Sequence, residues 1–212
     1  QYVRLYDKWS SYEPEDNGVV VAYTSVYGNT GKAALLLADK LRAGGCPNVS
    51  VYDLARCDMS EAVAAAFRYD KLVLATTTYN ADIFPFMRQF IEHLTERGYR
   101  NRSIGLIENG TWTATAARIM RGMFEKSRDI TFIEPTVTIK SAMTPENEQQ
   151  LDALAAAQLL DRPGREVVEA QVLATVRKSL SKSGSSSFLA AATMHRAEPR
   201  SATFSETVST PL

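Results

Sequence analysis

Cysteine and histidine are scarce in this chain of 212 residues, which has two of each. Cys46 and Cys57 do not form a CxxC pair, and neither His93 nor His195 has other metal-binding residues clustered beside it. A protein metal site needs several such ligands close together. The sequence therefore predicts no metal-binding and no catalytic residues, and it predicts reduced thiols, as in a cytoplasmic protein.

A net charge and a long apolar run are also missing. Lys and Arg together number 24, as do Asp and Glu, so no excess charge attracts nucleic acid or an anionic membrane. No apolar stretch approaches the length of a membrane span, and the first residues show no signal-peptide pattern. We therefore expect a cytoplasmic protein that binds neither nucleic acid nor membrane. The hydrophobic content of 45% is enough for a full core.

Two familiar phosphate-binding motifs are absent. There is no G-x-x-x-x-G-K-[ST], so no lysine is placed for a β- or γ-phosphate, and no G-x-G-x-x-G follows a strand. Instead, an apolar run ends at Ser25, and Gly28, Asn29 and Thr30 precede a helical stretch. Helix-terminal amides and these side chains predict a site for a terminal monophosphate. The alternative is that this loop is only a turn and a helix cap.

Strands and helices alternate through most of the chain. The apolar and β-branched runs predict strands at 19–25, 49–54, 71–76, 103–107 and 130–139, the last interrupted by Pro135. The predicted helices span 29–42, 60–67, 86–97, 114–127 and 145–158. This alternation predicts an α/β fold, a three-layer sandwich with a five-stranded parallel sheet of order 2-1-3-4-5.

The first 17 residues do not follow this alternation. They hold three tyrosines and Trp9, a density of aromatic side chains that predicts packing against something upstream, followed by a linker. The alternative is a short arm lying on the surface of the domain itself. Because the chain begins with Gln1, we interpret it as a fragment or a processed chain.

The last part of the chain is also unlike the middle. Val168, Val172 and Val176 have helical spacing, which predicts an amphipathic helix over 165–180, and the Ser-, Ala- and Thr-rich residues after it predict disorder. We therefore divide the chain into a linker (1–17), an α/β domain (18–158) and an atypical tail (159–212).

Three loops of the predicted sheet carry unusual residues. Ligands of such sheets lie at the carboxyl ends of the strands, where the strand order reverses, so the loops after the first, third and fourth strands should meet. The second of these loops is rich in hydroxyl groups and carries Tyr79, and the third has Gly110 close to Trp112. A flat ring between these aromatics, with a phosphate in the first loop, would account for all three, and flavin mononucleotide (FMN) is such a ligand. The alternative is that Tyr79 and Trp112 only cover the sheet.

The candidate FMN-binding residues all lie in these three loops. They are Thr24, Ser25, Val26, Tyr27, Gly28, Asn29, Thr30, Thr77, Thr78, Tyr79, Asn80, Glu108, Asn109, Gly110, Thr111 and Trp112. Backbone amides near Asn80 and Gly110 can reach the heteroatoms of a flavin ring, and we expect the peptide at Gly110 to tune the flavin potentials.

The same loops resemble those of a known family. Residues 24–30, 76–80 and 108–112 resemble the FMN-binding loops of flavodoxin-like domains, specifically those of flavodiiron proteins (A-type flavoproteins). Residues 6–10 resemble the stretch that joins the metallo-β-lactamase-like domain of that family to its flavodoxin domain. The resemblance implies FMN that receives electrons from rubredoxin or an NAD(P)H-linked reductase. It also implies a diiron site that reduces O2 or NO, and a head-to-tail homodimer.

The sequence departs from that family in two respects. It has no H-x-E-x-D-H run and only two histidines, so the diiron domain is missing from this chain, and the tail has no place in the family pattern. We therefore expect a module that transfers electrons but does not itself reduce O2 or NO. Two alternatives stay open: a free-standing flavodoxin-like electron carrier or flavin quinone reductase, and a binding module that has lost its flavin.

Overall fold

The computed structural model describes residues 2–160 of the chain. Its helices and strands are, in chain order, α1 (Tyr2–Ser11), β1 (Asp16–Tyr23), α2 (Asn29–Ala43), β2 (Val49–Asp53), α3 (Met59–Arg68), β3 (Tyr69–Tyr79), β4 (Asp82–Ile83), α4 (Pro85–Glu96), β5 (Arg102–Asn109), α5 (Ala116–Met123), β6 (Ile130–Ile139) and α6 (Pro145–Leu160). The helix predicted over 165–180 and the residues after it lie outside the described part.

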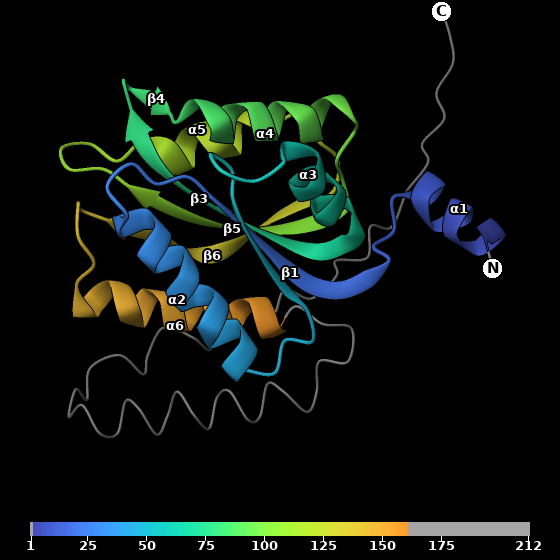
Figure 1. Ribbon diagram of the computed structural model, residues 1–212, viewed down its shortest axis with the longest axis horizontal. Coiled ribbons are helices and arrows are strands. Elements are labelled where there is room, and N and C mark those ends of the chain that lie inside the picture. Colours follow the sequence, from blue (N-terminus) through green and yellow to red (C-terminus); the bar gives the residue numbers. More distant parts are fainter. Residues whose placement is uncertain (1, 161–212) are drawn as a thin grey trace, which may run out of the picture. The chain divides into compact units, whose positions relative to one another are not determined.

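Five strands form a parallel sheet in the order β2-β1-β3-β5-β6 (Figure 1). The short strand β4 pairs antiparallel with the end of β3, outside this path. Counted without β4, the order is the predicted 2-1-3-4-5, so the fold class is confirmed. The pairing of β5 with β6 changes register between Gly105 and Ile107, close to the predicted interruption by Pro135.

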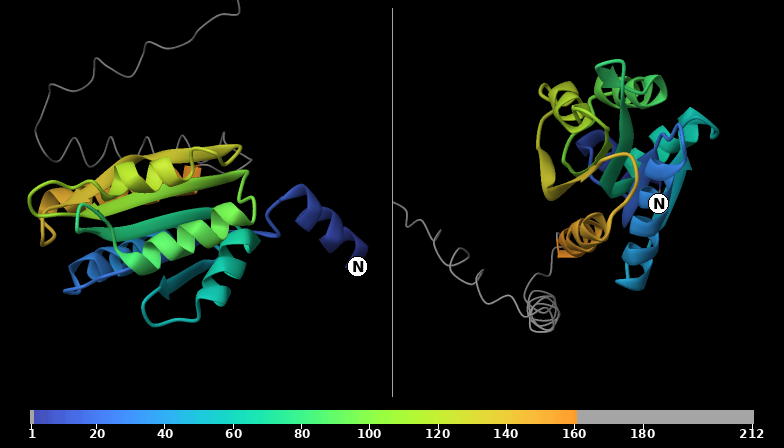
Figure 2. Two further views of the ribbon diagram at one scale, coloured as in Figure 1. Left: turned by 90° about the horizontal axis from the view of Figure 1, so that it is seen from above. Right: turned by 90° about the vertical axis from the view of Figure 1, so that its left-hand side faces the viewer.

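Helices cover both faces of the sheet. In Figures 1 and 2, α3, α4 and α5 lie on one face and α2 and α6 on the other. Side chains of a strand alternate between faces, and β1 shows this clearly. Val20 and Ala22 belong to the apolar cluster under α3 to α5, whereas Val19 and Val21 belong to the cluster under α2 and α6. The continuous apolar run therefore indicates a strand buried on both faces.

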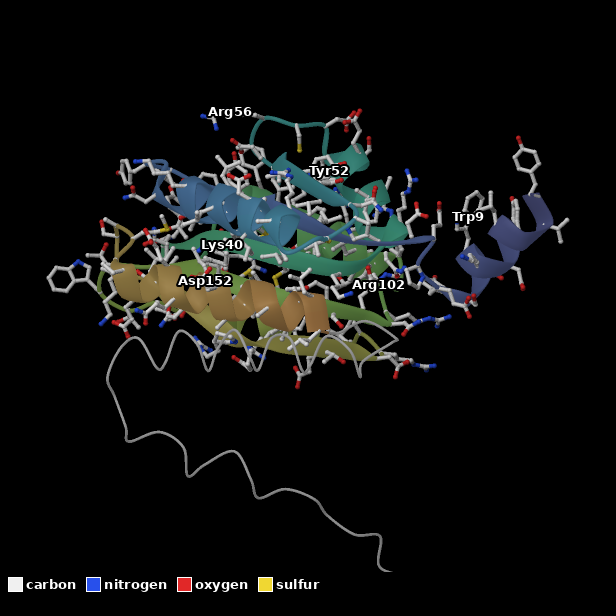
Figure 3. The ribbon with its side chains drawn as sticks, turned by 90° about the horizontal axis from the view of Figure 1, so that it is seen from below. Trp9, Lys40, Tyr52, Arg56, Arg102 and Asp152 are labelled. Atoms are coloured by element: carbon white, nitrogen blue, oxygen red, sulfur yellow. The ribbon has the colours of Figure 1, made fainter. Side chains whose placement is uncertain are left out.

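The helix α2 begins where a glycine reverses the chain after β1. Gly28 has a φ of 87° and immediately precedes the first helical residue. The helix turns one apolar side to the sheet: Ala33, Ala34, Leu37, Ala38 and Leu41. An ion pair between Lys40 and Asp152 joins it to α6, and Figure 3 shows these two side chains side by side.

The helix α1 was not predicted from the sequence. Tyr2, Tyr6 and Trp9 are spaced by four and three residues, which places them along one side of a helix, and the rings of Tyr6 and Trp9 lie 5.6 Å apart. That helical spacing is the sequence signal for α1, but ten residues with three aromatics fit a packed linker equally well. The linker role of residues 1–17 stays a prediction.

Two further elements differ from the prediction. The helix predicted to reach residue 127 ends at Met123, because the chain continues in tight turns from Phe124 N to Arg121 O and from Glu125 N to Gly122 O. Strand β4 was not predicted because two residues are too few to show a periodic pattern.

Candidate cofactor site

The loops after β1, β3 and β5 meet at the carboxyl edge of the sheet, on the left of Figure 1 and toward the viewer in the right view of Figure 2. Each pair of loops is joined by a hydrogen bond. The bonds are Thr24 to Thr76 between hydroxyl groups at 2.7 Å, Thr115 N to Thr78 Oγ1 at 3.1 Å, and Asn109 Nδ2 to Thr30 Oγ1 at 3.3 Å. The loops that the sequence expected to converge therefore form one connected surface.

The first loop ends at a helix terminus whose N-cap residue is a glycine. The N–H groups in the first turn of a helix have no partners within the helix, and Gly28 has no side chain that could accept from those of α2. Ser25 Oγ is buried and has no hydrogen-bond partner among the described residues. It lies 3.7 Å from the place where a Cβ on Gly31 would stand, so it faces the first turn of α2. An unpartnered buried hydroxyl beside free helix amides fits an anion.

The second loop is a tight hairpin between β3 and β4. Asn80 and Ala81 both have left-handed backbones, with φ of 50° and 59°, as a two-residue turn of the I′ kind requires. The hairpin presents Tyr79, whose side chain is half exposed and whose ring lies 5.4 Å from that of Phe84. The backbone of Ala81 is strained, because a Cβ is unfavourable at positive φ.

An open cleft of about 270 Å³ lies behind this hairpin, along α4. Its lining includes Tyr79, Asp82 and Arg88. The Arg88 guanidinium donates to the Asp82 carboxylate, and this bond, together with the N–H of Ile83, holds the pKa of Asp82 below its usual value. The ion pair therefore ties the hairpin to α4 at one side of the site.

The third loop follows two buried polar residues at the end of β5. Glu108 accepts from Ala117 N in the first turn of α5 at 2.8 Å and from the Thr138 hydroxyl at 2.9 Å. A carboxylate at the amino terminus of a helix stabilises the helix dipole. The side chain of Glu108 thus positions α5 and β6 and has these partners inside the protein.

The peptide between Asn109 and Gly110 is held at both polar atoms. Thr77 Oγ1 donates to Asn109 O at 3.2 Å, and Gly110 N donates to Ile139 O at 3.0 Å. A Cβ on Gly110 would stand only 3.0 Å from the Cα of Ala114, so the loop closes tightly around this glycine. The peptide that follows Gly110 is therefore the one that could still reorient toward a ligand.

Large apolar side chains are exposed around these loops. They are Val26, Tyr27, Tyr79, Phe86 and Trp112, with Tyr27 at 92% and Trp112 at 97% exposure. A side chain that anchors a loop is buried, and Trp112 is not. Its indole is instead available to cover a flat ligand.

Among the predicted site residues, some side chains are buried and others are exposed. The side chains of Thr24, Glu108 and Asn109 are buried and bind other parts of the protein, while Tyr27, Tyr79 and Trp112 are exposed. Three residues that hold the loops together were not among the candidate site residues: Thr76, which the sequence placed in the second loop, and Thr115 and Ser141. Thr76 and Thr115 belong to hydroxyl-rich stretches that gave a signal, whereas nothing in the sequence distinguished Ser141.

Other reactive groups give no sign of separate chemistry. Burial raises the pKa of the Cys57 thiol, which makes the thiolate scarce. Within residues 2–160, no three His, Cys, Asp or Glu side chains are grouped so that they could hold a metal ion. No helix in that part of the chain has the length and apolarity to cross a bilayer.

Relatives of known sequence share this region. Residues 20–155 match the family described as Flavodoxin domain. The anaerobic nitric oxide reductase flavorubredoxin of Salmonella paratyphi B is 26% identical over 184 residues, which cover 86% of this chain and 36% of that protein. The protein of the same name from Shigella flexneri is 26% identical over 181 residues, with coverages of 84% and 35%. The chain thus spans about a third of the length of these relatives.

Solved structures with low sequence identity share the fold. Rubredoxin oxygen:oxidoreductase from Desulfovibrio gigas superposes with a TM-score of 0.69 at 19% identity, over 80% of this chain and 40% of that one. A flavodoxin from Streptococcus pneumonia TIGR4 gives 0.58 at 21% identity, over 68% of this chain and 99% of that one. With its three loops, its parallel sheet and a family match over most of the described residues, this chain belongs to the flavodoxin domain family and is related to the flavorubredoxins and flavodiiron proteins.

Proposed function

We propose that this chain binds FMN without a covalent link and transfers electrons through it. One observation carries the proposal: the three loops are joined pairwise by hydrogen bonds around a helix terminus where the buried hydroxyl of Ser25 has no partner within the described part of the chain. When bound, FMN supplies one- and two-electron redox chemistry.

The residues of the chain would hold the two ends of this ligand differently. The first-turn amides of α2, with the hydroxyl groups of Ser25 and Thr30, would bind the phosphate. Tyr79 and Trp112 would lie against the flavin ring and exclude water from it. The backbone after Gly110 offers polar groups to the edge of the ring, because the peptide before Gly110 is already engaged.

In a longer protein, we propose that electrons reach the flavin from rubredoxin or an NAD(P)H-linked reductase and leave it for a diiron site. That site would lie in a metallo-β-lactamase-like domain outside this chain and would reduce O2 or NO in a cytoplasmic, head-to-tail homodimer. The names of the relatives, nitric oxide reductase and rubredoxin oxygen:oxidoreductase, support this assignment, as does the match to only 36% of the flavorubredoxin. The exposed aromatic side of α1, with Tyr2 and Tyr6, is where such a domain would make contact.

A free-standing flavodoxin-like carrier or flavin quinone reductase is the second candidate. The superposition that covers 99% of a complete flavodoxin favours it. A protein of that kind would have no use for α1. If deletion of residues 2–11 left both solubility and electron transfer unchanged, this second candidate would be preferred.

Titration of the purified chain with FMN tests the proposal. We expect flavin absorption to stay with the protein through gel filtration, quenched flavin fluorescence, and stepwise reduction under anaerobic conditions. FMN that elutes free from a folded chain would refute the proposed function.

A Ser25→Ala variant sharpens this test. Because the Ser25 hydroxyl has no hydrogen-bond partner among residues 2–160, its removal should not lower stability, yet it should weaken FMN binding by about tenfold through the loss of one bond to a charged group. Ser10→Ala, on α1, is the matched control and should leave FMN binding unchanged.

A further inference from the structure

Asn109 is paired with the backbone of Ser141 through both atoms of its side-chain amide. Ser141 N donates to Asn109 Oδ1 at 3.0 Å, and Asn109 Nδ2 donates to Ser141 O at 3.1 Å. A backbone N–H can only donate and a carbonyl can only accept, so these two bonds fix which way the amide faces. The atom of Asn109 that faces Thr30 is therefore Nδ2.

This orientation determines the role of the Thr30 hydroxyl. Asn109 Nδ2 lies 3.3 Å from Thr30 Oγ1, and because Nδ2 can only donate, Thr30 Oγ1 accepts this bond. Thr30 is 2% exposed and is the second residue of α2. Among the described residues, no acceptor is found for the hydrogen of its own hydroxyl group. That hydrogen is left to donate to a ligand at the first turn of α2.

We infer that Asn109 is a positioning residue for the phosphate of the bound flavin, because it directs the Thr30 hydroxyl hydrogen into the anion site at the start of α2. This inference rests on the proposed binding of FMN. Asn109 itself is 7% exposed, and both atoms of its amide are already bonded, so it acts through Thr30 and not by touching the ligand.

Asn109 would then also contribute to the preference for FMN over riboflavin. A hydroxyl donates more strongly to a charged phosphate than to a neutral group, so the arrangement favours FMN over riboflavin, which has no phosphate. Without Asn109, the Thr30 hydroxyl can turn to other acceptors, and part of this preference is lost.

Binding of FMN and of riboflavin by the full chain tests the inference. The variants are Asn109→Ala, Thr30→Val and the double substitution. Each single variant should weaken FMN binding by about tenfold, the size expected for one bond to a charged group. The double variant should lose no more than either single one, because both substitutions remove the same interaction. Riboflavin affinity should change by less than about twofold in all three.

Asn147→Ala is the matched control. Asn147 is also a buried asparagine, and it holds the chain between β6 and α6 through Thr138 O and Thr144 N; none of its hydrogen bonds to the described residues reaches α2. It should lower stability but leave the ratio of FMN to riboflavin affinity unchanged.

Two kinds of outcome would overturn the inference while the proposed function stands. One is an equal loss of FMN and riboflavin affinity in Asn109→Ala, and the other is full additivity of the two single losses. A wild-type chain that binds neither flavin would instead refute the proposed function, and the inference with it.

Discussion

The guanidinium of Arg102, the first residue of β5, donates a 2.6 Å hydrogen bond to the carbonyl oxygen of Tyr12, which lies 90 residues earlier in the chain. The same group donates to Phe67 O and Tyr69 O at the end of α3, where the helix dipole favours a cation. Arg102 is 4% exposed, and burial lowers its pKa. In Figure 3, Arg102 is labelled at the edge of the sheet opposite the loops that follow β1, β3 and β5. One buried cation therefore connects the segment after α1, the end of α3 and β5.

Replacement of Arg102 should therefore be costly. Arg102→Leu removes the donor from several partly buried carbonyl groups, and we expect the free energy of unfolding in urea to fall by about 3 kcal/mol. Arg56→Leu is the control, because 76% of the Arg56 side chain is exposed, and it should change stability by less than about 0.5 kcal/mol. A loss below about 1 kcal/mol at Arg102 would contradict this explanation.

Ala81→Gly should stabilise the protein. An alanine at a φ of 59° is disfavoured by about 1–2 kcal/mol relative to glycine, whereas glycine adds about 0.5–1 kcal/mol of unfolded-state entropy. The strain is the larger effect, so we expect a gain of up to about 1 kcal/mol by urea unfolding. Ala55→Gly, at an exposed position without positive φ, should lower stability instead. If both substitutions changed the free energy of unfolding in the same direction, the hairpin would not be strained at Ala81.

The pKa of Asp82 should rise when Arg88 is replaced by Gln. The ion pair with Arg88 lowers the pKa of Asp82 in the folded state. The pair therefore stabilises the fold at a pH above the unfolded-state pKa of Asp82, and this stabilisation is lost as the pH falls through the folded-state pKa. Both groups are well exposed, so the contribution at pH 7 should be below about 1 kcal/mol. NMR titration of the Asp82 carboxyl group measures the shift. Arg56→Gln should not alter it, and an unchanged Asp82 pKa in Arg88→Gln would exclude the pair as its cause.

Gly110→Ala should weaken FMN binding. The added Cβ would stand 3.0 Å from the Cα of Ala114 and 3.2 Å from Thr78 Oγ1, so the third loop must shift. We expect at least a tenfold loss of affinity and altered one-electron potentials, since about 1.4 kcal/mol of strain corresponds to a factor of ten. Gly122→Ala, in α5 with open space around the new Cβ, should leave binding unchanged. If Gly110→Ala left the FMN affinity and the flavin potentials unchanged, Gly110 would not be part of the FMN site.

The two tryptophans of the chain allow a direct test of ring contact. If the Trp112 indole covers the flavin, FMN should quench tryptophan fluorescence in the wild type and in Trp9→Phe, but should have little effect in Trp112→Phe. Titration with FMN while tryptophan emission is followed gives the result. Quenching that persists in Trp112→Phe and disappears in Trp9→Phe would place the ligand elsewhere.

Some parts of the candidate site could be predicted from short stretches of the sequence, and others could not. The apolar run of β1, then Gly28 before α2, indicated a helix terminus at a strand end, because these signals lie within a few adjacent residues. The engagement of Glu108 and Asn109 inside the protein could not be predicted. Their partners Ala117, Thr138 and Ser141 lie 9 to 32 residues away, and pairing over such distances depends on how α5 and β6 pack against β5.

The alternation of strands and helices, the sheet order and the composition of the three loops could all be predicted from the amino-acid sequence. Hydrophobic periodicity and turn residues act locally, and crossovers between parallel strands have one hand. Which polar side chains are bonded inside the protein, and which are left without a partner at the loops, became visible only in the three-dimensional structure of residues 2–160. That choice depends on burial and on donors and acceptors brought together from distant residues, as in the contacts of Thr30 with Asn109 and of Tyr12 with Arg102.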